Sequence, residues 1–158
     1  MAARATGLCA SCAPPLQSKE TLIARGQPVF VALAPVDPRS LMQGDFMRLE
    51  FRLPPDAMDR STSGERSIRP YVVARRDARN VATLLRVDSA GRPLGADEFR
   101  IELAPKDGRW ILATDAWFFR EGEAARWANA RFGEFRVGAD GKALLVGMAD
   151  AELRAISP

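Results

Sequence analysis

Residues 44–51 read Gly44-Asp45-Phe46-Met47-Arg48-Leu49-Glu50-Phe51 and combine a turn signal with a strand pattern. Gly44 suits a tight turn that needs a positive φ or a close backbone approach, and Asp45 can accept backbone N–H groups across that turn. Apolar and polar side chains then alternate through residues 46–53, which predicts a half-buried strand. Leu49 and Phe51 fall on its apolar side, so we expect both in the core.

Further strands are predicted on both sides of this segment. The apolar run at residues 29–33 indicates a buried strand. Three more pairs of strands are each joined by a turn, namely 71–75 with 81–87, 99–103 with 110–114, and 134–137 with 143–146. These patterns predict a mainly β or α+β fold in which an antiparallel meander sheet curls toward a barrel.

One amphipathic helix is expected near residues 121–131, with acidic residues in its first turn, Trp127 as its anchor on the sheet, and Gly133 just past its end. Residues 19–25 could form a short helix or turn. Residues 1–18 are small and polar, so we expect a flexible tail there and a single domain over residues 19–158.

Composition excludes several classes of function. The chain has 158 residues, 47% hydrophobic and 27% charged, with a net charge of +3 and no histidine. Without histidine, Ser-His-Asp and Cys-His mechanisms are excluded, and the commonest nitrogen ligand of zinc is missing. The arginines are scattered rather than gathered in a basic stripe, which argues against nucleic-acid binding. No Gly-rich phosphate loop or metal-spaced cluster occurs, so we expect no cofactor and no metal.

The N-terminal segment carries both cysteines, Cys9 and Cys12, in a spacing typical of redox pairs and zinc knuckles. Neither function has supporting residues nearby, so we interpret them as a thiol pair in a tail, with no assigned role. No stretch reaches the roughly 18 apolar residues of a membrane span, and we expect the chain as given to be soluble.

Several linked motifs resemble the bacterial GDYXXLXY family, with phenylalanine in place of both signature tyrosines. Residues 44–51 carry the signature, and the similar flanks are Lys19-Glu20 and residues 33–43, 118–122 and 130–137. The resemblance covers about residues 19–153.

The resemblance implies a membrane-associated protein of unknown function at the periplasmic face of the cell envelope. Members generally carry a membrane helix just before the Lys-Glu pair and are often encoded beside multi-pass membrane proteins. Residues 1–18 contain no such helix, so either the anchor is lost or the start of the sequence is truncated.

We therefore expect an accessory or interaction domain that docks on an integral membrane protein. The candidate contacts are short carboxylates and forked arginines in one loop and strand, which can make charge-assisted hydrogen bonds: Asp37, Arg39, Asp45, Arg48 and Glu50. The same residues could instead brace a turn or lie exposed as ordinary neighbours. Gly44, Leu49, Phe51 and Gly133 are expected to be structural.

Two other functions remain open. A Ser-Lys hydrolase distantly like signal peptidases would use Ser40 as nucleophile and Lys106 or Lys142 as a desolvated base. A small-ligand site in a barrel-like sheet would be lined by Trp110, Trp117 and Trp127, although tryptophans at such positions are more often core anchors.

Overall fold

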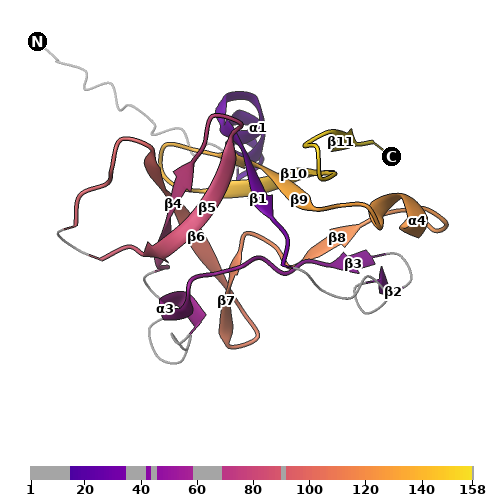
Figure 1. Ribbon diagram of the computed structural model, residues 1–158, viewed down its shortest axis with the longest axis horizontal. Coiled ribbons are helices and arrows are strands. Elements are labelled where there is room, and N and C mark those ends of the chain that lie inside the picture. The colour runs from indigo at the N-terminus through magenta and orange to yellow at the C-terminus, as the bar shows by residue number, and fades with distance from the viewer. Residues whose placement is uncertain (1–14, 35–41, 44–45, 59–68, 90–91, 158) are drawn as a thin grey trace, which may run out of the picture.

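A computed structural model of the protein describes residues 15–34, 42–43, 46–58, 69–89 and 92–157, and most of its regular structure is strand. Eight strands form the large sheet: β1 (Gln27–Ala32), β4 (Tyr71–Arg76), β5 (Val81–Val87), β6 (Glu98–Lys106), β7 (Arg109–Leu112), β9 (Phe132–Val137), β10 (Ala143–Ala149) and β11 (Ala155–Ile156). Three strands form a small sheet: β2 (Met42–Gln43), β3 (Phe46–Arg48) and β8 (Ala116–Phe118). Figure 1 shows the small sheet beside one end of the large one.

The large sheet has the order β11-β10-β9-β1-β5-β4-β6-β7. The three predicted strand pairs are confirmed as β4–β5, β6–β7 and β9–β10. The sheet is nevertheless mixed rather than wholly antiparallel, because β1 lies antiparallel to β9 and parallel to β5. It curves but is not closed into a barrel, so the expected curling is found without closure.

The predicted strand at residues 46–53 is shorter than the alternation suggested. β3 ends at Arg48, and Leu49 then donates its N–H to Asp115 O. Phe51 forms an isolated antiparallel bridge with Leu33 at the end of β1. This signature segment therefore connects the small sheet to the large one, and the short helix α3 (Pro55–Met58) follows it.

Two cores lie on either side of this connection. The larger is built from the apolar faces of β1, β4, β5, β6 and β9, and the smaller gathers Met47, Leu49, Trp127, Ala130 and Met148. Leu49 is buried, as predicted, whereas Phe51 is partly buried and packs against both cores. Its ring meets that of Phe135 edge-on at 5.3 Å between centroids.

The helices differ from expectation in length. The predicted helix at residues 121–131 is reduced to α4 (Ala124–Trp127). Gly122, at φ +87°, has a left-handed backbone conformation that a helix cannot include, and β9 already begins at Phe132. Trp127 is buried, as expected of its anchor.

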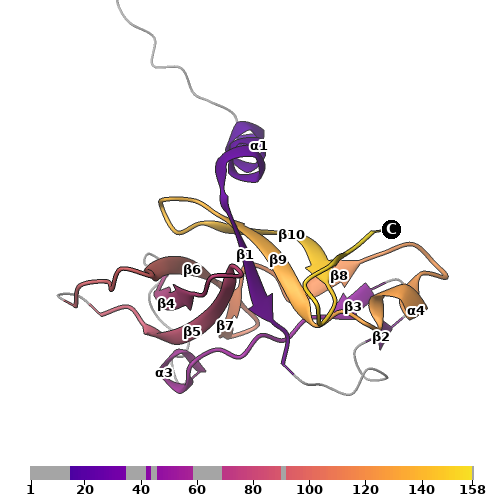
Figure 2. The same ribbon diagram turned by 45° about the horizontal axis from the view of Figure 1, so that its top comes forward.

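The first helix is longer than expected. α1 (Pro15–Arg25) takes in residues 15–18, which were predicted to belong to a tail, and Gly26 ends it by donating its N–H to Leu22 O. Figure 2 shows α1 standing on one side of the large sheet. No helix among the described residues has the length and apolar character to cross a membrane. Cys9 and Cys12 lie outside the described residues.

A charged network covers the outer face of β4, β5 and β6. Glu98 accepts two hydrogen bonds from Arg86, at 3.2 and 3.0 Å, and lies 3.5 Å from Arg75. The hydrogen bonds from Arg86, followed by that from the Gly95 N–H, lower the pKa of Glu98 to about 2. An ionised Glu98 therefore holds three segments of the chain together.

Replacing Glu98 by glutamine should remove a pH-dependent part of the stability. Because its folded-state pKa lies below the ordinary 4.5, Glu98 stabilises the fold fully above that pH and loses this effect as the pH falls toward 2. We expect the difference in unfolding free energy between the natural chain and Glu98→Gln to shrink over that range in urea titrations. Glu152→Gln is the control, since its ion pair with Arg154 is largely exposed. A difference that does not change with pH would contradict the role of Glu98.

Gly133 of β9 lies where the two cores meet. A Cβ there would come within 3.0 Å of Leu145 Cδ1 and Phe135 Cε2, and within 3.2 Å of Phe51 Cε1. The expected structural role of Gly133 is thus a packing role rather than a helix-ending one.

Gly133→Ala should destabilise the protein by about 1–3 kcal/mol, because the added methyl overpacks this junction. Gly147→Ala on the adjacent strand is the matched control, since its nearest contact would be an ordinary 3.4 Å to Glu134 Oε2. The control should stay within about 1 kcal/mol of the natural chain in chemical denaturation. Equal effects of the two substitutions would show that the junction is not tightly packed.

Candidate functional site

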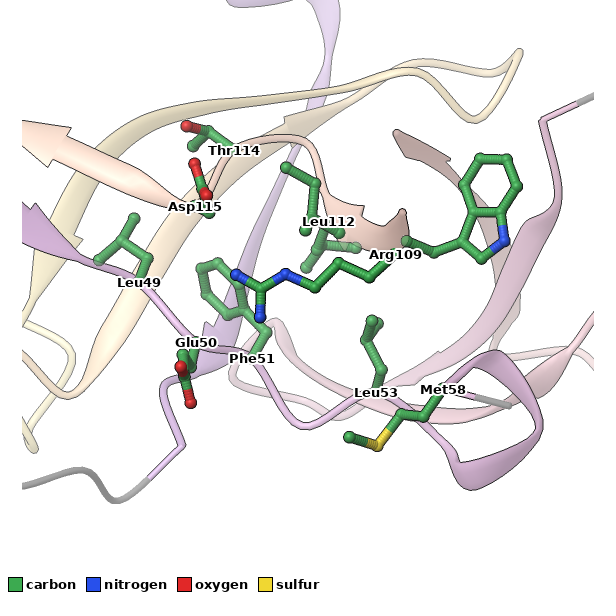
Figure 3. A pocket seen from close by; sticks show the side chains of 11 residues that line it. Leu49, Glu50, Phe51, Leu53, Met58, Arg109, Leu112, Thr114 and Asp115 are labelled. Atoms are coloured by element: carbon green, nitrogen blue, oxygen red, sulfur yellow. The ribbon is translucent and has the colours of Figure 1, made fainter. Parts of the chain in front are cut away.

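A cleft of about 260 Å³ opens where the small sheet ends, and we call it the signature cleft. One wall is formed by Leu49, Glu50, Phe51 and Leu53 of the signature segment. The opposite wall is residues 109–112 of β7 with Thr114 and Asp115, and Met58 of α3 lies at the rim (Figure 3). The signature segment is therefore one side of a surface depression as well as a structural connector.

The inner part of the cleft is apolar and fixed in position. Leu49 and Leu112 are buried, and Phe51 is held by its edge-on contact with Phe135. Such a surface can receive an aliphatic or aromatic group without rearranging.

Charged groups lie around the opening. Figure 3 shows the Arg109 side chain extending across the cleft, with its guanidinium toward the side where Glu50 and Asp115 lie. Asp115 is ion-paired with Lys106, whereas Arg109 makes no ion pair within the described part of the chain. Arg109 is thus the cation available to a bound carboxylate.

The turn that leads from β7 into the cleft wall is strained. Ala113 has φ +56°, a left-handed value that alanine rarely adopts, and Thr114 donates its N–H to Leu112 O at 2.6 Å. The Thr114 hydroxyl donates to Ala116 O at 3.2 Å. Strained residues of this kind gather at binding sites, where the surrounding structure holds them in place.

The outer face of the small sheet adjoins the cleft, and we call Phe46, Arg48 and Phe118 the signature face. Phe46 and Phe118 are register partners with ring centroids 5.9 Å apart, and Arg48 is paired with Ala116. Phe118 is 74% exposed. On the opposite side, Met47 and Trp117 pack into the smaller core.

The predicted contact residues are placed as follows. Arg48 is exposed on the signature face, and Glu50 is exposed at the cleft. Asp37, Arg39, Gly44 and Asp45 lie outside the described residues. Sequence reasoning missed Phe118, although the alternation of Trp117 and Phe118 could have identified it, and it missed Arg109, whose place in the cleft depends on the tertiary fold.

The residues of the two other functions are not brought together. Ser40 lies outside the described residues. Lys106 forms an ion pair with Asp115 and Lys142 forms one with Asp140, and both lysine side chains are exposed. Trp110 lines the cleft. Trp117 and Trp127 instead pack edge-on in the smaller core, with their ring centroids 5.4 Å apart. Within the described ranges no group of three acidic or cysteine side chains could hold a metal ion.

Ala113→Gly tests the strain at the cleft. Relief of the left-handed conformation, about 1–2 kcal/mol, should exceed the entropic cost of glycine, about 0.5–1 kcal/mol. We expect a net gain of about 0.5 kcal/mol in unfolding free energy, whereas Ala104→Gly on β6 should lose about 0.5–1 kcal/mol. Similar losses from both substitutions, measured by denaturant unfolding, would rule out strain at Ala113.

The comparisons with known proteins bear on the whole chain. No curated protein and no solved structure matches it. The family model described as "GDYXXLXY protein" matches residues 11–148, which is most of the chain. This match includes both walls of the cleft and the signature face, and on its strength the chain belongs to the GDYXXLXY family.

Proposed function

We propose that this chain is an interaction domain of the bacterial envelope that docks on an integral membrane protein through the signature face and the adjoining cleft. The observation that carries the proposal is the aromatic pair on the outer side of the small sheet, in which Phe118 is exposed and Phe46 is half-buried beside it. Aromatic residues, phenylalanine included, and arginine are enriched in the buried centres of protein–protein interfaces.

The small sheet presents this pair in a fixed orientation. Alternate residues of β3 and β8 point to opposite sides, so Met47 and Trp117 are held in the core while Phe46 and Phe118 point outward. A face fixed in this way loses little side-chain entropy on binding. The pair is therefore suited to an apolar pocket or groove of a partner.

Charge at the same surface favours a partner with carboxylates. Neither Arg48 nor Arg109 is ion-paired to any described residue, so both guanidinium groups are available for two parallel hydrogen bonds. The backbone leads directly from the signature face into the cleft wall, since Arg48 ends β3 and Leu49 begins that wall. An extended acidic and apolar segment of a partner would contact the face and place one side chain in the cleft.

The proposed location rests on the family resemblance. Members generally carry a membrane helix just before the position of Lys19-Glu20, which here lies within α1. A periplasmic domain attached close to the membrane would meet a multi-pass protein of the kind often encoded beside family members, and such a protein is the first partner to test.

Photo-crosslinking from position 118 provides the test. A benzoylphenylalanine placed there, in cells that also express a multi-pass protein of this kind, should give one crosslinked product containing that protein. The same probe at position 79 is the control, because the Arg79 side chain is 70% exposed in the β4–β5 turn and lines neither the signature face nor the cleft. Phe118→Ser should lower co-purification of the partner at least tenfold, and Arg79→Ser should not. Equal crosslinking or equal recovery at the two positions would contradict docking through the signature face.

A further inference from the structure

A second cavity, of about 470 Å³, lies away from the signature cleft and shares no lining residue with it. It is lined by the start of β1, the end of β4, the start of β6 and the end of β9. In the sheet order, β5 and β4 lie between β1 and β6. The cavity therefore exists because the large sheet curves far enough for these strands to face one another.

The β9–β10 turn closes one side of the cavity. Gly141 accepts a hydrogen bond from the Glu102 N–H of β6 at 2.8 Å. A Cβ at Gly141 would lie 2.8 Å from Tyr71 Cε1, so the turn is packed tightly against β4 and β6. The wall formed by Val137, Gly138 and Ala139 is thereby held in place across from Phe99.

The interior of this cavity is apolar. Val29 and Val137 are almost fully buried in the core, and Phe99 is partly exposed and packs against the same core. Of these three side chains Phe99 supplies most of the accessible apolar surface, and an aliphatic or aromatic group packed on it is removed from water.

Among the charged residues that line the cavity and form no ion pair with another described residue, positive charges exceed negative charges by one. Glu98 is bound by Arg86 and Arg75, and Arg100 by Asp88 at 2.6 Å. The charged lining residues that remain are two arginines and one carboxylate, namely Arg25, Arg76 and Asp97. Arg25 makes no ion pair with any residue the structure describes, and Arg76 donates only to the neutral Gln27 side chain, at 2.9 Å.

We propose that this cavity binds a small amphiphile with a single anionic group, a carboxylate or a phosphate monoester, on an apolar body. Arg25 and Arg76 hold the anionic group at the rim, and the body lies against Val29, Phe99 and Val137. Arginine suits either head group because its planar fork donates two parallel hydrogen bonds. The cavity, at about 470 Å³, falls within the size range of small-molecule sites. This site is independent of the docking function proposed above.

Titration with matched eight-carbon probes tests the site. Octanoate and octyl phosphate, added as monomers to the intact chain, should shift the methyl NMR signals of Val29 and Val137. Octanol and octylammonium should bind at least tenfold more weakly, because they lack the anionic group. The tighter of the two anions identifies the head group.

Charge-removing variants complete the test. Arg76→Gln and Arg25→Gln should each weaken binding of the anionic probe about tenfold, as expected for loss of a charge-assisted hydrogen bond. Arg92→Gln, at an exposed arginine that does not line the cavity, should leave the affinity unchanged. Unfolding curves of the variants verify that each is folded. The proposal is overturned if octanol binds as tightly as octanoate, if both rim variants keep full affinity, or if the Val29 and Val137 signals do not move.

Discussion

The contact of Phe51 with both cores is the interaction on which the rest of the structure depends. Its ring packs edge-on against Phe135 in the larger core and also touches the smaller one, and Gly133 leaves the space that the ring requires. The small sheet has only three short strands, and a sheet of that size with one wet face gains stability chiefly by packing on something larger. The packing of Phe51 between the two cores therefore fixes the position of the signature face.

The family signature can be understood in these terms. Its leucine, Leu49, is buried in the smaller core, and its last aromatic position, Phe51, joins the two cores. Its first aromatic position, Phe46, instead points outward beside Phe118. One short segment, β3 and the three residues after it, thus carries both the residues that fix the domain and a residue proposed to meet a partner.

Curvature of the large sheet has a separate consequence. It separates an inner apolar face, which ends in the larger cavity, from an outer face where charged groups pair across neighbouring strands. Glu98 shows the relation between them, since it lies at the cavity while its carboxylate is held by Arg86 and Arg75. With that carboxylate occupied, the charge left at the cavity rim is set by Arg25, Arg76 and Asp97.

The sequence by itself determined the features that depend on neighbours along the chain. Alternation and turn residues identified the β4–β5, β6–β7 and β9–β10 pairs, the burial of Leu49, and the anchoring role of Trp127. Alternation also placed Arg48 and Glu50 on the side opposite the apolar residues, and both are exposed, although only Arg48 lies within β3. Only the tertiary structure decided that β1 joins β5 in parallel, that the predicted 121–131 helix shortens to α4, and that Arg109 and Phe118 lie beside the signature. The reason is physical: local patterns reflect the period of a strand or helix, whereas pairings between distant segments depend on which apolar surfaces can be buried together.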